Sequence, residues 1–64
     1  MALPHAQLSA ISSGLDELVV RVAELGEALD ADGGSDAANA LFEAERALKM
    51  ATRALARARR SLRA

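Results

Sequence analysis

The fold of this chain is decided by residues 35–62, which read SDAANALFEAERALKMATRALARARRSL. Leucine recurs there every seven residues, and an alanine lies four positions before each leucine. Apolar positions that step by four and then by three share one side of an α-helix, so the stretch predicts a helix with one continuous packing seam. These apolar positions are Leu41, Leu48, Leu55 and Leu62 with Ala37, Ala44, Ala51 and Ala58.

A second apolar stripe runs through the first half of the chain. Its steps of three and four predict a helix from about Pro4 to about Ala31, with an a/d pattern typical of coiled coils. Pro4 suits the first turn, because its missing N–H would have no partner there. Ser13 is an alternative start, since it reads as an N-cap with an acid three residues on, but the stripe begins before it. The stripe consists of Leu8, Ile11, Leu15, Leu18, Val22, Leu25 and Leu29.

Residues 32–35, Asp-Gly-Gly-Ser, interrupt both stripes. Two adjacent glycines permit the left-handed conformation that ends a helix. Ser35 is the expected N-cap of a second helix over about 36–63, and Asp36 lies in its first turn, where the helix dipole favours negative charge. Two helices of equal length joined by a short turn predict an antiparallel hairpin. Residues whose numbers add up to about 67 are then expected to lie level.

The composition also predicts one all-α domain over residues 1–64. Alanine and leucine dominate, with one Phe, one Pro and no Trp or Tyr, which favours helix over strand. Ordering so short a chain costs about 1.5 kcal/mol per residue, so a lone hairpin is not expected to be stable. Ala40, Ala47 and Ala54 widen the packable face beyond one neighbour, which predicts association into a four-helix bundle.

The formal net charge of −1 hides a strong asymmetry along the chain. Arg21 is the only arginine or lysine before Arg46, and from Arg46 onward every charged residue is positive. An antiparallel hairpin is therefore acidic at its turn and basic at its open end. Two hairpins packed head to tail bring unlike ends together, so we expect an antiparallel homodimer in which charge chooses the orientation.

The basic residues of the second helix form a candidate anion-contact face. Like charges three and four residues apart repel by about 0.2–0.5 kcal/mol per pair, so nucleic acid, an acidic protein or anionic lipid would relieve a cost. The simpler interpretation is a solvated face. No aromatic residue accompanies these cations, so any nucleic-acid contact is expected at phosphates. The residues are Arg46, Lys49, Arg53, Arg57 and Arg60.

No pattern indicates catalysis, a metal or another cofactor. The absence of Cys excludes disulfides and thiolate metal sites. Residues 30–36 resemble a calcium loop, but the sixth position is Ser35 instead of Gly and the twelfth is Leu41 instead of Glu, so a turn is the better interpretation. His5 has no second ligand, and the serines have no base, so we do not expect an enzyme.

The turn carries a resemblance to a known family. Leu29-Asp30-Ala31-Asp32, followed by Asp36, Leu41 and Leu48, resembles the Rop family of plasmid copy-number regulators over a handful of positions. The resemblance implies a hairpin that dimerises antiparallel into a four-helix bundle and binds paired RNA loops. That family meets RNA with polar, basic and aromatic side chains of its first helix, a pattern absent here, so only the architecture is carried over. The outer face here offers Ser9, Ser13, Asp16, Val20 and Glu27.

These patterns predict a small non-enzymatic protein–protein interaction module, acting as an adaptor, assembly factor or regulator. Its expected partner is a second copy or another helical protein. The alternative is a nucleic-acid-associated regulator that contacts phosphates through the basic face of the second helix. Residues 1–15 lack a basic leader, and no apolar run is long enough to span a bilayer, so we expect a cytoplasmic protein.

Overall fold

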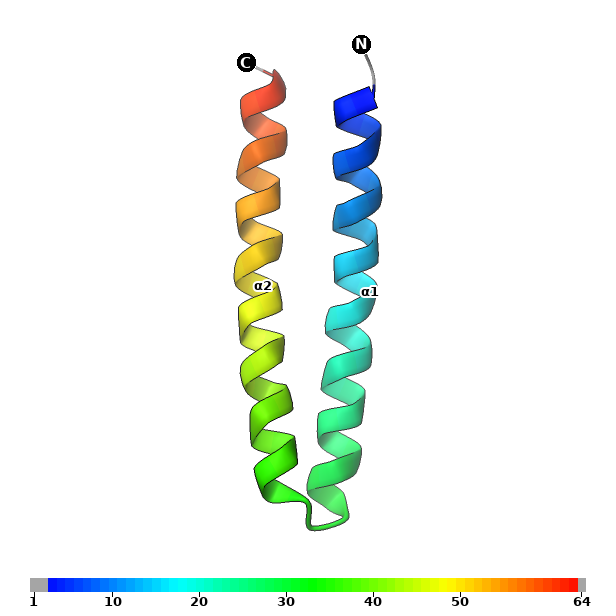
Figure 1. Ribbon diagram of the computed structural model, residues 1–64, viewed down its shortest axis with the longest axis vertical. Coiled ribbons are helices and arrows are strands. Elements are labelled where there is room, and N and C mark those ends of the chain that lie inside the picture. The colour runs from blue at the N-terminus through cyan, green and yellow to red at the C-terminus, as the bar shows by residue number, and fades with distance from the viewer. Residues whose placement is uncertain (1–2, 64) are drawn as a thin grey trace.

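The computed structural model describes residues 3–63, which form two α-helices, α1 (Leu3–Ala31) and α2 (Ser35–Arg63). Residues 1, 2 and 64 of the predicted domain lie outside this range. No strand occurs within residues 3–63. The helices lie side by side and antiparallel, with the turn at one end and both termini at the other (Figure 1). The predicted all-α hairpin is therefore confirmed.

Each helix has 29 residues, and the Cα rod measures 50 × 15 × 9 Å. A helix of this length is about 43 Å long at 1.5 Å per residue, so the two helices span nearly the whole rod. α1 runs without interruption through Ser13, which means that the alternative helix start there is wrong. The apolar stripe before Ser13 has the helical period, and it continues the same helix.

The turn ends α1 with a Schellman motif. Gly33 has φ of 84°, in the left-handed region that favours glycine. The Gly34 N–H donates to the Leu29 carbonyl at 2.8 Å, and the Gly33 N–H donates to the Asp30 carbonyl at 3.1 Å. The Gly34 carbonyl then accepts from the Ala38 N–H at 2.9 Å, which is the first hydrogen bond of α2. Gly34 therefore holds the N-cap position expected for Ser35, because the chain re-enters a helix directly after the motif.

The interface between α1 and α2, which we call the seam, follows a heptad spacing on both helices. Its leucines and Val22 belong to the predicted stripes, whereas its intermediate positions do not. Small or polar residues fill these intermediate positions except at Val19, and all seam residues are buried or half-buried. The seam consists of Leu8, Ser12, Leu15, Val19, Val22, Gly26 and Leu29 of α1 with Ala38, Leu41, Glu45, Leu48, Thr52 and Leu55 of α2.

Gly26 packs closely against Phe42 of α2. A Cβ added at Gly26 would lie 2.7 Å from Cε1 of Phe42, closer than real Cβ contacts. A Cβ added at Gly14 would meet nothing within 4 Å. A side chain at position 26 would therefore force the Phe42 ring to shift, and this contact lies close to the predicted register.

The hairpin alone encloses very little. Among the described residues, Ala38 is the only fully buried hydrophobic residue, and no large side chain is fully buried. Two helices cover only one side of each seam leucine, and a chain of this length has few other residues to cover the rest. The hairpin of one chain therefore has only a small buried core.

Candidate functional site

The most extensive candidate site is a row of exposed apolar residues beside the seam. On α1, Ile11, Leu18 and Leu25 are 56%, 46% and 53% exposed. Each lies four residues before a seam leucine or valine, so all three share one flank of α1. On α2, alanines take the same position relative to the seam leucines. They are Ala37, Ala44, Ala51 and Ala58, of which Ala44 is half-buried and the others exposed.

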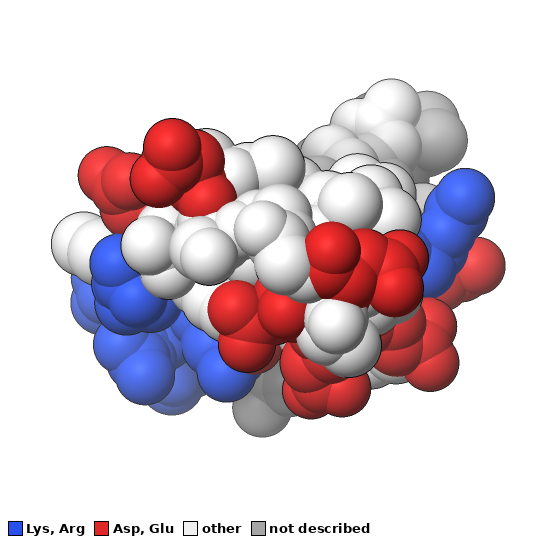
Figure 2. All heavy atoms as spheres, turned by 90° about the horizontal axis from the view of Figure 1, so that it is seen from below, with Lys and Arg blue, Asp and Glu red and all other residues white. Residues whose placement is uncertain are grey.

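These two rows lie on the same side of the hairpin. The helices are antiparallel, so their residues advance in opposite rotational senses when both are viewed from one end. Positions with the same offset from the seam therefore fall on one side. We call this side the apolar face, made of Ile11, Leu18 and Leu25 of α1 with Ala37, Ala44, Ala51 and Ala58 of α2. Figure 2, seen from the turn end, shows uncharged atoms over the middle of its upper surface.

The opposite side of the hairpin carries a shallow groove with charged walls. Asp16 and Lys49 each follow a seam leucine by one residue and line this groove from α1 and α2. The Thr52 hydroxyl donates to the Leu48 carbonyl at 2.9 Å, so it is satisfied within its own helix. Among the described residues that line the groove, no buried polar side chain therefore lacks a hydrogen-bond partner. It is lined by Asp16, Val19, Lys49, Thr52 and Arg53.

The structure places the fifteen residues of the two predicted stripes in two environments. Half-buried are Leu8, Leu15, Val22, Leu29, Leu41, Ala44, Leu48 and Leu55. Exposed are Ile11, Leu18, Leu25, Ala37, Ala51, Ala58 and Leu62. One chain thus covers only part of its stripe, and the exposed part forms most of the apolar face.

The predicted anion-contact residues, Arg46, Lys49, Arg53, Arg57 and Arg60, are all exposed on α2. Basic side chains gather at the lower left of Figure 2, away from the uncharged upper surface. Lys49 Nζ lies 3.1 Å from Glu45 Oε2, the only ion pair among the side chains that the structure describes. Pairs of this i, i+4 type contribute only about 0.3–0.5 kcal/mol. The guanidinium groups face solvent.

The other candidates for chemistry are not brought together. His5 is exposed on α1. A hollow at the turn is lined by Gly33, Gly34, Ser35, Asp36 and Ala37, and Asp36 is its only acidic residue. Within residues 3–63, no cluster of three or more His, Asp or Glu side chains is placed to hold a metal ion.

Neither helix, over the residues that the structure describes, contains an apolar segment long enough to cross a membrane. No family model matches the chain, and no curated protein or solved structure matches it either. The likeness to the Rop family therefore extends only to the helical hairpin itself.

Proposed function

We propose that the protein is a non-enzymatic protein–protein interaction module that acts as a homodimer, with the apolar faces of two hairpins packed into a four-helix bundle. The observation that carries this proposal is the exposure of Ile11, Leu18 and Leu25 on the same side as the alanine row of α2. Full burial of a leucine or isoleucine is worth about 1.5–3 kcal/mol relative to exposure. Each of these side chains is about half exposed, so covering three per chain supplies a substantial part of the missing core energy.

The apolar face has the composition of a bundle interior. Large side chains on α1 fill space, while the alanines on α2 let backbones approach closely. A two-fold dimer with its turns at opposite ends pairs α1 with α1 through the large residues and α2 with α2 through the alanines. The resulting core then runs along the whole rod.

Charge supports this head-to-tail orientation. Asp30, Asp32 and Asp36 lie at the turn, whereas Arg57 and Arg60 lie toward the open end, and all five are exposed. Head-to-tail packing brings these unlike ends together, while turns at the same end would stack like charges. Each exposed pair is worth a few tenths of a kcal/mol, so burial supplies affinity and charge selects orientation. The Rop resemblance agrees with this arrangement, and RNA binding is not part of the proposal.

The dimer is tested by comparing Leu18→Asp with Val20→Asp in sedimentation equilibrium at high salt. Both changes place a carboxylate on α1 at an exposed apolar position, since Leu18 is 46% and Val20 is 57% exposed. Only Leu18 belongs to the apolar face. We expect a dimer for the wild type and for Val20→Asp, and a monomer with reduced helicity for Leu18→Asp. A wild-type protein that is monomeric and fully helical would contradict the proposal.

A second candidate function is phosphate contact by the exposed cations of α2. It is favoured by the four arginines among them, Arg46, Arg53, Arg57 and Arg60, none of which forms an ion pair within residues 3–63. Binding to mixed duplex DNA or RNA at low salt, with a steep loss of affinity as salt rises, would support this alternative. No binding at low salt would remove it.

A cytoplasmic location, which the lack of cysteine fits, stays a prediction.

A further inference from the structure

The outer sides of the two helices, which neither the seam nor the apolar face uses, also have complementary compositions. Val20 of α1 is 57% exposed and Met50 of α2 is 66% exposed. Val20 lies within about one turn of Glu17 and Glu24. Met50 has the opposite surroundings, because it shares a surface hollow with Arg46, Lys49 and Arg53. We call the first group, Glu17, Val20 and Glu24, the acidic edge, and the second group, Arg46, Met50 and Arg53, the basic edge.

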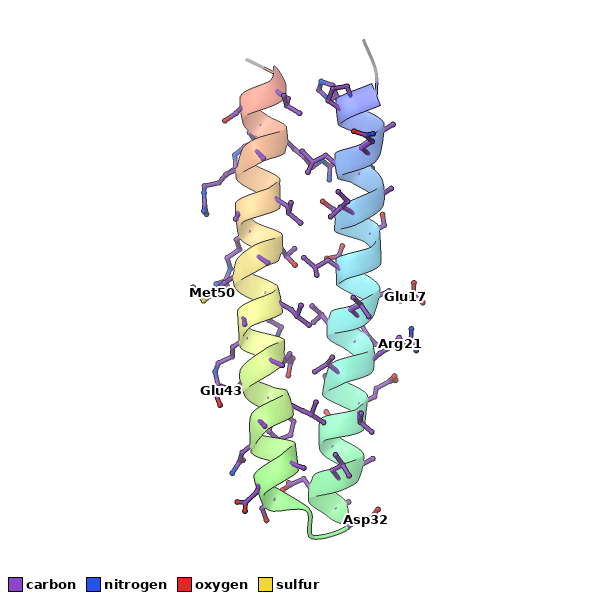
Figure 3. The ribbon with its side chains drawn as sticks, viewed as in Figure 1. Glu17, Arg21, Asp32, Glu43 and Met50 are labelled. Atoms are coloured by element: carbon purple, nitrogen blue, oxygen red, sulfur yellow. The ribbon has the colours of Figure 1, made fainter. Side chains whose placement is uncertain are left out.

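The two edges lie at the same height on opposite sides of the hairpin. Glu17 and Arg21 point away from α2, and Glu43 and Met50 point away from α1 (Figure 3). The contact between Gly26 and Phe42 fixes which residues are level, and by this register Val20 lies within one turn of Met50. A second copy placed beside the first, in the same orientation, therefore meets each edge with its complement.

We propose that copies of this protein associate edge to edge, with the acidic edge of one copy against the basic edge of the next. The contact places α1 antiparallel to a neighbouring α2, with Val20 against Met50 and the glutamates beside the arginines. A methionine side chain adapts its shape to such contacts. Phosphate binding, in contrast, would not require an exposed methionine beside the arginines. Because the two edges differ, each contact leaves one free acidic edge and one free basic edge, and the association is open-ended.

This association goes beyond the proposed dimer, because it uses sides that the dimer leaves free. In the head-to-tail dimer both copies of α1 lie along one side and both copies of α2 along the other. Two edge contacts then form at once between neighbouring dimers, which strengthens a weak individual contact. Single hairpins present the same edges, so the proposal can be tested even if the dimer fails.

Two charged residues on the outer sides carry a charge opposite to that of the edge beside them. Arg21 lies on the flank of α1 toward the apolar face, and by the register it is level with the small residue Ala47. Glu43 points outward from α2 near Arg46 and is level with Glu24 and Glu27 of the neighbouring copy. Arg21 is therefore tolerated, whereas Glu43 weakens the contact.

The test measures the size of the protein by sedimentation velocity over a range of concentrations, at low and at high salt. Wild-type protein is expected to form growing species at low salt that revert to one size at high salt, since screening weakens exposed charge pairs. Glu17→Arg with Glu24→Arg gives a chain with two basic edges, and Arg46→Glu with Arg53→Glu gives a chain with two acidic edges. Each double variant alone is expected to associate at least about tenfold more weakly than wild type.

A mixture of the two double variants provides the matched control, because each edge again meets its complement. Growth at low salt is expected to return in the mixture, which a folding defect in either variant would prevent. Glu43→Arg is expected to strengthen wild-type association severalfold. Wild-type protein of one fixed size at low salt and high concentration would overturn the proposal, even if that protein binds nucleic acid. Growth that the charge reversals leave unchanged would overturn it as well.

The two proposals fail in different ways in this experiment. If the dimer is wrong, the unit that remains at high salt is a monomer. If the edge contact is wrong, that unit does not grow at low salt. The far-ultraviolet circular dichroism of every variant is compared with wild type to verify that the helices are intact.

Discussion

The seam and the apolar face differ in how much apolar surface they bury within one chain. The seam places Ser12, Gly26, Glu45 and Thr52 between the helices, residues that are buried or half-buried but contribute little apolar surface. The apolar face carries Ile11, Leu18 and Leu25 where their own chain leaves them about half exposed. The seam therefore sets how the two helices pack, whereas the apolar face leaves large apolar side chains in water, where the proposed second copy would bind.

The largest expected effect comes from truncating one leucine on each side of this comparison. Leu48→Ala removes a seam leucine, and Leu18→Ala removes one from the apolar face. If a second copy covers the apolar face, each change lowers the free energy of unfolding by about 2 kcal/mol or more, as for core leucines. Urea unfolding at fixed protein concentration measures both. A Leu18→Ala variant as stable as wild type would mean that the apolar face stays in water.

The turn that positions both surfaces comes next in size. Gly33→Ala forces a side chain into a left-handed conformation, at a cost of about 1–2 kcal/mol. Because the turn sets the seam and the apolar face together, thermal unfolding is expected to shift downward as a single transition. A Gly33→Asn variant, whose side chain tolerates this conformation better, is expected to recover part of the loss. Equal stability of Gly33→Ala and wild type would contradict the Schellman motif.

The smallest expected effects separate the two helical glycines. Gly14→Ala adds a methyl group into open space and is expected to stabilise α1 by up to about 1 kcal/mol through helix propensity. Gly26→Ala gains the same propensity but drives its Cβ into the Phe42 ring, so it is expected to be less stable than Gly14→Ala. Chemical denaturation of both variants measures the difference. Equal gains would show that the seam is looser at Phe42 than the contact indicates.

The period of the apolar residues, together with Gly33 and Gly34, was sufficient to predict the helices, the turn and the antiparallel hairpin. They did not predict which flank of the stripe faces the neighbouring helix. Leu8 and Leu15 can share a packed row with either Ile11 or Ser12. A heptad pattern indicates which residues are buried, but it does not indicate which helix covers them. Gly26 was the available signal, since an isolated glycine inside a helix costs stability and therefore suggests a packing reason. The N-cap at Gly34 was missed because the Schellman motif shortens the turn.

The central claim is that a second copy covers the apolar face with its turn at the opposite end of the rod. The chain has no cysteine, so Asp32→Cys gives a single site at the exposed turn for a nitroxide spin label. Pulsed dipolar spectroscopy at high salt, where edge contacts are screened, then measures the separation of the two labels. The head-to-tail dimer predicts one distance near the length of the rod, about 40–50 Å. A distance below about 20 Å, as for turns at the same end, or no dipolar coupling between copies would contradict the claim.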